Sequence, residues 1–183
     1  MILHWEQLVM HFGPELAIHQ PKFEKAWRAT YAMLCCRWFP ANDKLAQNQG
    51  PHAEARLLAS DHWQTHLPAA LAAWDARNDP IVTCLVINRS PCPSCAGELV
   101  TSLAKLHRRF PVACDRGRFV LASLGVYDPA CVEAATKIPD LVRLREAGWE
   151  LCVLQVGSEL TGRGEELKQA LERLGWRGFI RLR

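Results

Sequence analysis

The sequence has no long apolar run, no basic leader and no strong excess of charge of either sign. Its longest apolar stretches, such as residues 81–87, are far too short to cross a bilayer. In residues 1–6, His4 and Glu6 interrupt the apolar positions, unlike in a signal peptide. A formal net charge of +3 is too small to require a nucleic-acid partner. We therefore expect no membrane attachment, and a protein of the cytoplasm or one delivered into the cytoplasm of a target cell.

Internal repeats and low-complexity linkers are also missing, which favours one domain over residues 1–183. Hydrophobic residues make up 49% and charged residues 22%, an ordinary globular composition. We expect a helical or irregular lead-in at 1–29, a core at 30–156, and a C-terminal helix and tail at 157–183. Cysteine, in contrast, is plentiful at eight residues, but a chain of this size does not need disulfides. A reducing compartment is the simpler expectation.

Apolar runs and helical periodicity alternate along the chain. Runs typical of strands cover 30–39, 81–88, 119–126 and 150–156, and 41–51 is expected to be a turn or loop. Helices are predicted at 52–67, then briefly through Trp74, and at 94–110, 129–147 with a break at Pro139, and 165–174. The more than twenty residues between the last two strands permit a parallel pairing. This order predicts a layered α/β domain with helices on a mixed sheet.

Two short motifs each open a predicted helix. His52-Ala53-Glu54 begins one, and Pro91-Cys92-Pro93-Ser94-Cys95 begins the other. The order H-x-E … P-C-x-x-C is the signature of zinc-dependent nucleobase deaminases. Cysteines three apart in a first helical turn project to the same side. The positive end of the helix is expected to favour the thiolate form that binds metal.

His52 is predicted to join Cys92 and Cys95 as the third ligand of Zn²⁺. Three protein ligands leave the fourth tetrahedral position for water, which is typical of a catalytic site. Glu54 is then the catalytic residue, acting first as a base and later as an acid. Either motif alone is weak, since C-x-x-C also occurs in redox and structural sites. The main alternative is a structural zinc site that uses another cysteine, but such a site has no use for Glu54.

Beyond these motifs, the chain resembles the AID/APOBEC family of polynucleotide cytidine deaminases from about residue 30 to 156. The stretches that carry the resemblance are TYAMLCCRWF, HAEARLL, SPCPSCAGEL, ASLGVYDP and LREAGWELCVLQ. The resemblance implies a three-layer cytidine-deaminase-like α/β fold. Its mixed five-stranded sheet would carry helices on both faces, and its last two strands would be parallel, as in the polynucleotide branch.

The resemblance also implies three contacts with the substrate. Tyr127 would pack on the flipped cytosine, Asp128 would contact the base on its 5′ side, and Ser90 would contact the cytosine edge. Each of the first two has another interpretation. Tyr127 would equally suit a structural tyrosine at a strand end, and Asp128 before Pro129 would suit a helix N-cap.

Some positions depart from the family pattern. Arg89 stands where the family has tryptophan, so the floor of the substrate pocket is altered there. The loop before His52 is short, and Asn48 is the candidate for the family's sugar-contacting asparagine. The spacing between Glu54 and Pro91 exceeds the family's usual one. These departures indicate a distant relative of bacterial or toxin type, and an immunity protein would be the partner of a toxin domain.

We therefore expect a cytidine deaminase that converts cytosine to uracil in single-stranded DNA. RNA, double-stranded DNA and free cytidine nucleotides stay open as substrates, as does a non-catalytic, zinc-stabilised nucleic-acid-binding module. The arginines of the stretch 108–118 are candidates for holding phosphates or for an ordinary solvated surface: Arg108, Arg109, Arg116 and Arg118.

Overall fold

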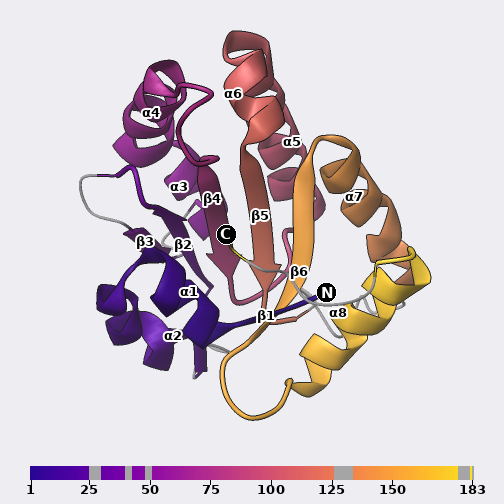
Figure 1. Ribbon diagram of the computed structural model, residues 1–183. Helices are drawn as coiled ribbons and strands as arrows, with labels where there is room; N and C mark the ends of the chain where they lie inside the picture. The colour runs from indigo at the N-terminus through magenta and orange to yellow at the C-terminus, as the bar shows by residue number, and fades with distance from the viewer. Residues whose placement is uncertain (25–29, 40–42, 48–50, 126–133, 177–181, 183) are drawn as a thin grey trace.

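One mixed sheet of six strands organises the fold in a computed structural model that describes residues 1–24, 30–39, 43–47, 51–125, 134–176 and 182 (Figure 1). The strand order is β1-β6-β5-β4-β2-β3. Four neighbouring strands, β1, β6, β5 and β4, run parallel, and β2 is antiparallel to both of its neighbours. The strands are β1 (Ile2–His4), β2 (Tyr31–Cys36), β3 (Asp43–Gln47), β4 (Val82–Ile87), β5 (Arg118–Ser123) and β6 (Trp149–Gln155).

The predicted mixed α/β sheet is present, but its strand count of five is wrong. β3 lies inside residues 41–51, which were predicted as a turn or loop, and β1 lies inside the lead-in. Both are short edge strands, and neither carries the apolar run that marks a buried strand. The last two strands, β5 and β6, do pair in parallel, from Phe119 opposite Trp149 to Ser123 opposite Val153. However, the parallel region continues beyond them, because β1 adds to the other side of β6.

Helices cover both faces of the sheet. On one face lie α1 (Trp5–Phe12), η1 (Pro14–His19) and α2 (Gln20–Glu24), whose buried side chains pack on β2, β4, β5 and β6. The remaining helices cover the other face: α3 (Ala53–Leu58), η2 (His62–His66), α4 (Leu67–Ala73), α5 (Pro93–Arg109), α6 (Pro111–Arg116), α7 (Ala134–Glu146) and α8 (Gly162–Arg173). None of the described helices combines the length and apolar character of a membrane span.

Two helix predictions needed correction. The helix expected over 52–67 consists of α3 and the π-helical turn η2, and α4 then begins at Leu67 with Pro68 in its first turn, where a proline is tolerated. The predicted break at Pro139 is absent, since α7 continues on both sides of that residue. Pro139 is exposed, so the helix loses one hydrogen bond on its solvent side without losing a packed contact.

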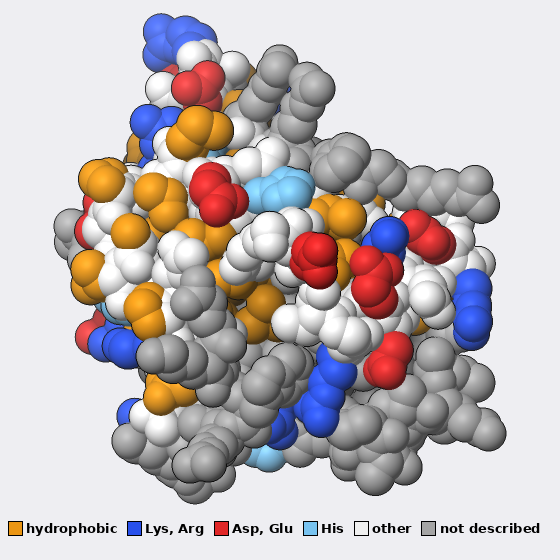
Figure 2. Space-filling view, turned by 90° about the horizontal axis from the view of Figure 1, so that it is seen from below, with side chains coloured by type: hydrophobic (Ala, Val, Ile, Leu, Met, Phe, Trp, Pro, Cys, Tyr) orange, Lys and Arg blue, Asp and Glu red, His pale blue; other side chains and the backbone are white. Residues whose placement is uncertain are grey.

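The direction of the sheet decides where chemistry can take place. The carboxyl ends of β4 and β5 point to the lower end of the molecule in Figure 1, which is the end that Figure 2 views. α5 starts a few residues after β4 ends and runs back along the sheet toward α6. The first turn of α5 therefore lies at the carboxyl edge, and its last turn lies at the opposite end. Below, these two ends are called the carboxyl end and the distal end of the sheet.

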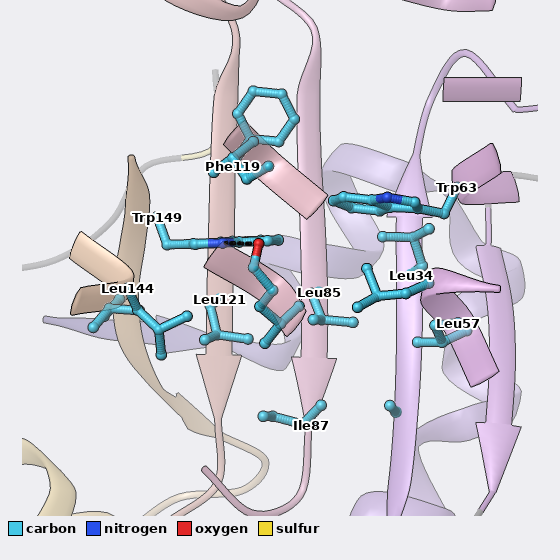
Figure 3. Close-up of a cluster of buried hydrophobic side chains, with 14 of the residues drawn as sticks. Leu34, Leu57, Trp63, Leu85, Ile87, Phe119, Leu121, Leu144 and Trp149 are labelled. Carbon is cyan, nitrogen blue, oxygen red and sulfur yellow. Dashed lines mark hydrogen bonds between the residues drawn. The ribbon is translucent and has the colours of Figure 1, made fainter. Parts of the chain in front are cut away.

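Aromatic side chains join the helices to the sheet in the larger core cluster (Figure 3). Trp63 of η2 stacks on Trp149 of β6, with ring centroids 6.1 Å apart and planes at 16°. The Trp149 indole N–H donates to the Leu99 carbonyl of α5, at 3.4 Å. Trp63 is thus a packing residue. These contacts fix α5, and with it the C-x-x-C turn, against the sheet.

Candidate metal centre

His52, Cys92 and Cys95 converge at the carboxyl end of the sheet. The Nδ1 atom of His52 lies 3.1 Å from the Sγ atom of Cys95 and 3.4 Å from that of Cys92. The ligand atoms of all three residues lie within 4.8 Å of one another, and both cysteines are buried. The two motifs, about forty positions apart in the chain, therefore form one potential metal-binding triad.

Local backbone structure explains how the three side chains meet. His52 is the N-cap of α3, in an extended conformation with φ −60° and ψ 150°. Cys92 is the N-cap of α5, and its sulfur accepts a hydrogen bond from the Cys95 backbone N–H at 3.5 Å. Pro93 occupies the first helical position, where the missing N–H leaves no bond unmade. Each ligand is thus fixed by the start of a helix.

The donor set fits zinc. Two thiolates and one imidazole nitrogen are ligands that Zn²⁺ prefers, and in a tetrahedral site sulfur and nitrogen ligands are about 3.6 Å apart. The observed distances of 3.1 and 3.4 Å are a few tenths of an ångström shorter. Among the described residues, no further histidine, cysteine, aspartate or glutamate joins this group. A site with three protein ligands keeps a position for a small exogenous ligand.

The carboxyl group of Glu54 is buried beside these ligands. Glu54 is only 3% exposed, and its Oε2 atom has no hydrogen-bond partner in the described part of the chain. Burial, the largest cause, raises the pKa of Glu54, while the nearby His52 and Cys95 act in the opposite direction. A buried carboxyl oxygen without a partner costs free energy, so it indicates a place where a ligand or water is expected.

The Cys95 thiol differs from the sequence-based prediction. Burial, followed by the charge of Glu54 and the neighbouring Cys92, raises the pKa of Cys95. The expected thiolate-favouring effect of the helix N-terminus is thus outweighed by desolvation. A divalent cation is the charge that would allow this sulfur to ionise, because metal binding displaces the thiol proton.

Backbone contacts hold the adjoining loop against the end of β5. Ser90 is 3% exposed, and its N–H donates to the carbonyl of Gly125 at 2.7 Å. Asn88, only 1% exposed, accepts the Tyr31 N–H through Oδ1 at 3.0 Å and donates its own N–H to the Tyr31 carbonyl at 3.2 Å. Asn88 was not among the predicted site residues, although a polar residue directly after a mostly apolar run was the signal that could have identified it.

The remaining predicted substrate residues have different outcomes. Ser90 is buried two residues before Cys92 in the chain, and Arg89 is partly buried in the same loop. Tyr127, Asp128 and Asn48 lie outside the described residues. The roles assigned to these five residues therefore stay predictions.

The arginines considered for phosphate binding are not beside the triad. Arg108 and Arg109 end α5, and 13 residues of helix from Cys95 to Arg108 span about 20 Å. Arg118, at the start of β5, forms an ion pair with Glu150 at 2.7 Å. On the face viewed in Figure 2, lysine and arginine side chains lie at several places, with acidic side chains among them.

The other described cysteines do not complete a structural zinc site. Cys35, Cys84 and Cys152 belong to the core cluster under α1, on the opposite face of the sheet from α3 and α5. All seven described cysteines are free thiols. Burial raises the pKa of Cys84, as expected for a cysteine that acts as a small apolar residue.

The chain matches no protein-family model and no curated protein.

Proposed function

We propose that this chain is a zinc-dependent deaminase that hydrolyses cytosine to uracil in single-stranded DNA. The observation that carries the proposal is the buried Glu54 carboxyl, whose Oε2 atom lacks a partner, beside a group of two cysteines and one histidine. A structural zinc site does not require a buried carboxylate with an unpartnered oxygen atom. A hydrolytic site requires one, because a proton has to move between water and substrate.

The residues of the site have two roles in the proposed reaction, metal binding and proton transfer. His52, Cys92 and Cys95 would hold the metal, and zinc, when bound, supplies a Lewis acid that lowers the pKa of a water molecule toward neutrality. Glu54 takes a proton from the water whose oxygen adds to C4 of cytosine, and delivers it to N3. It then transfers the second proton to the amino group, which leaves as ammonia. The pKa of Glu54, raised by burial, suits a group that must both accept and release a proton.

Two features favour a polynucleotide as the substrate. The parallel pairing of β5 and β6 through α7 is the arrangement of the polynucleotide branch of the family that the sequence resembles. In addition, the triad is recessed, with both cysteines and Glu54 buried. A base in a duplex would have to leave the stack to reach it, which favours single strands.

The test combines a substrate panel with two matched variants. Purified zinc-loaded protein is incubated with single-stranded DNA carrying one cytosine in each 5′ context, and uracil is detected by excision and strand cleavage. Glu54→Gln should lower the rate by at least about 100-fold while zinc binding stays at one ion per chain. Glu98→Gln, on the exposed side of α5 one turn after Cys95, should retain most of the activity.

Each result has a distinct meaning. Loss of uracil formation in Glu54→Gln but not in Glu98→Gln supports the proposal. Uracil formed in RNA, duplex DNA or free cytidine but not in single-stranded DNA would keep the chemistry and overturn the substrate. Zinc bound at one ion per chain without deamination of any of these substrates would overturn the enzyme assignment.

A further inference from the structure

A pocket lies at the distal end of the sheet, at the opposite end from the metal centre. It has a volume of about 480 Å³ and is lined by His11, Arg37, Trp38, Asn78, Asp79 and residues at the start of β4. β2 ends at Cys36 opposite Thr83, so Arg37 and Trp38 emerge beside the amino end of β4. The triad follows the carboxyl end of the same strand, and six strand residues span roughly 20 Å. This distal pocket is therefore separate from the metal centre.

The walls of the distal pocket are built from fixed turns. The Phe39 N–H donates to the Cys36 carbonyl at 3.1 Å, which closes a turn with Arg37 and Trp38 at its tip. On the other side, the Trp74 indole N–H donates to the Asp79 carbonyl at 3.1 Å, and the Asn78 N–H donates to the Asp75 carbonyl at 2.8 Å. A pocket of this volume with preformed walls is within the range of small-ligand sites.

Trp38 gives the pocket an exposed aromatic face. It is 42% exposed, whereas Trp5, Trp63 and Trp149 are each at most 3% exposed. Phe39, the next residue, is buried at 5%, so the chain anchors this turn in the core and leaves the indole outside. An indole held in this way can stack on a planar ring at little further cost in conformational entropy.

Positive charge faces the same space. Arg37 is exposed, and the His11 imidazole lies near both Arg37 and Arg118. Burial, the largest cause, and the charges of these two arginines lower the pKa of His11. The charged side chains in the pocket lining are the Arg37 guanidinium and the Asp79 carboxylate, and a guanidinium is the side chain best suited to a phosphate group.

We infer that the distal pocket binds a nucleotide, with the base stacked on Trp38 and the phosphate near Arg37. The Asn78 amide and the Asp79 carboxylate, both exposed in the pocket, offer donor and acceptor groups to the base edge. The nucleotide is either free or one unit of a single strand, since both present the same base and phosphate. This site is independent of the metal centre and of the reaction proposed there.

The test uses ligands that cannot be deaminated. Binding of thymidine monophosphate, of an oligothymidylate and of inorganic phosphate to the zinc-loaded full chain is measured by calorimetry. Trp38→Ala should weaken nucleotide binding about tenfold, and Trp38→Phe should restore most of it, because phenylalanine retains a face for stacking. Arg37→Ala should weaken binding by a similar factor. Lys105→Ala, which removes an exposed positive charge on α5 outside the pocket, should change little.

The two sources of nucleotide are separated by the ligand pair. If thymidine monophosphate binds and the oligothymidylate does not, the ligand is a free nucleotide. If the oligothymidylate binds more tightly than the monophosphate, the ligand is a unit of a single strand. The inference is overturned if phosphate alone binds as tightly as the monophosphate, or if no ligand binds. It is also overturned if Arg37→Ala and Trp38→Ala, both folded by circular dichroism, bind these ligands as tightly as the native protein does. The measurement is of binding by ligands that cannot be deaminated, so the result does not depend on the deaminase assignment.

Discussion

Asn88 stands where the buried strand β4 gives way to the loop that carries Ser90 and Cys92. Its side chain accepts the Tyr31 N–H at 3.0 Å, and 99% of the residue is shielded from water. Asn88→Ala should lower the free energy of unfolding by about 1–3 kcal/mol, because it leaves a polar group at the start of β2 without its partner. Urea denaturation measures the loss.

Gln169, exposed on α8, provides the matched control for this change. Gln169→Ala should alter the free energy of unfolding by no more than about 0.5 kcal/mol, as is usual for a surface substitution. Equal effects of the two substitutions would show that the Asn88 bond does not support the loop.

At the scale of single residues, the grouping of His52, Cys92 and Cys95 could be predicted, and its environment could not. The spacing of Cys92 and Cys95 is sufficient for both sulfurs to face one ion. On a regular helix, residues two positions apart face different ways. His52 precedes α3 as an extended N-cap, so this restriction does not apply to His52 and Glu54. The raised pKa of Cys95 depends on burial and on Glu54, and no spacing in the sequence contains that information.

Among the elements that carry none of the three candidate ligands, α8 is bonded at its N-terminus to the segment that follows β5. Its N-cap Thr161 accepts the Gly164 N–H at 3.0 Å and donates to the Leu124 carbonyl at 3.3 Å. A Cβ added to Gly164 would lie 2.9 Å from that same carbonyl oxygen. Gly164→Ala should therefore push α8 away from the end of β5 and lower the free energy of unfolding by about 1–3 kcal/mol. Chemical denaturation measures this effect.

A second glycine in the same turn tests whether crowding is the cause. A Cβ on Gly162 would meet nothing within 4 Å, so Gly162→Ala should be neutral or stabilise by up to about 1 kcal/mol. The crowding argument is wrong if the two substitutions destabilise equally. Because Gly125 follows Leu124 and accepts the Ser90 N–H, Gly164→Ala should also reduce uracil formation, whereas Gly162→Ala should not.

The two strands that the sequence did not predict share one physical property. β1 has three residues and gains its hydrogen bonds from β6, some 150 positions away in the chain. β3 is a mostly polar edge strand paired only with β2 in the sheet order. Strands of this kind depend on long-range pairing rather than on local composition. The buried strands β4, β5 and β6, in contrast, were recognisable as apolar runs because both of their faces are covered.

For the whole molecule, zinc and folding should be coupled. Metal that binds the folded chain stabilises it by about 4 kcal/mol when its free concentration is 1,000 times its dissociation constant. In a domain of this size that corresponds to a rise of about 8–16 °C in melting temperature. A chelator should therefore lower the melting temperature of the native protein by such an amount. Calorimetric scans with and without the chelator measure the shift.

Protonation of the Cys95 thiol decides how the zinc-dependent rise in melting temperature changes with pH. Burial raises the pKa of Cys95, and zinc must displace its proton, so protons and zinc compete for the same sulfur. Lowering the pH should weaken zinc binding and reduce the stabilisation, and raising it should do the reverse. Cys95→Ser should melt at the same temperature with and without the chelator. Cys114→Ala, which removes a buried sulfur remote from the triad, should keep the full zinc-dependent shift. A shift lost equally in both variants would mean that zinc stabilises the chain elsewhere, and the assignment of His52, Cys92 and Cys95 as its ligands would fail.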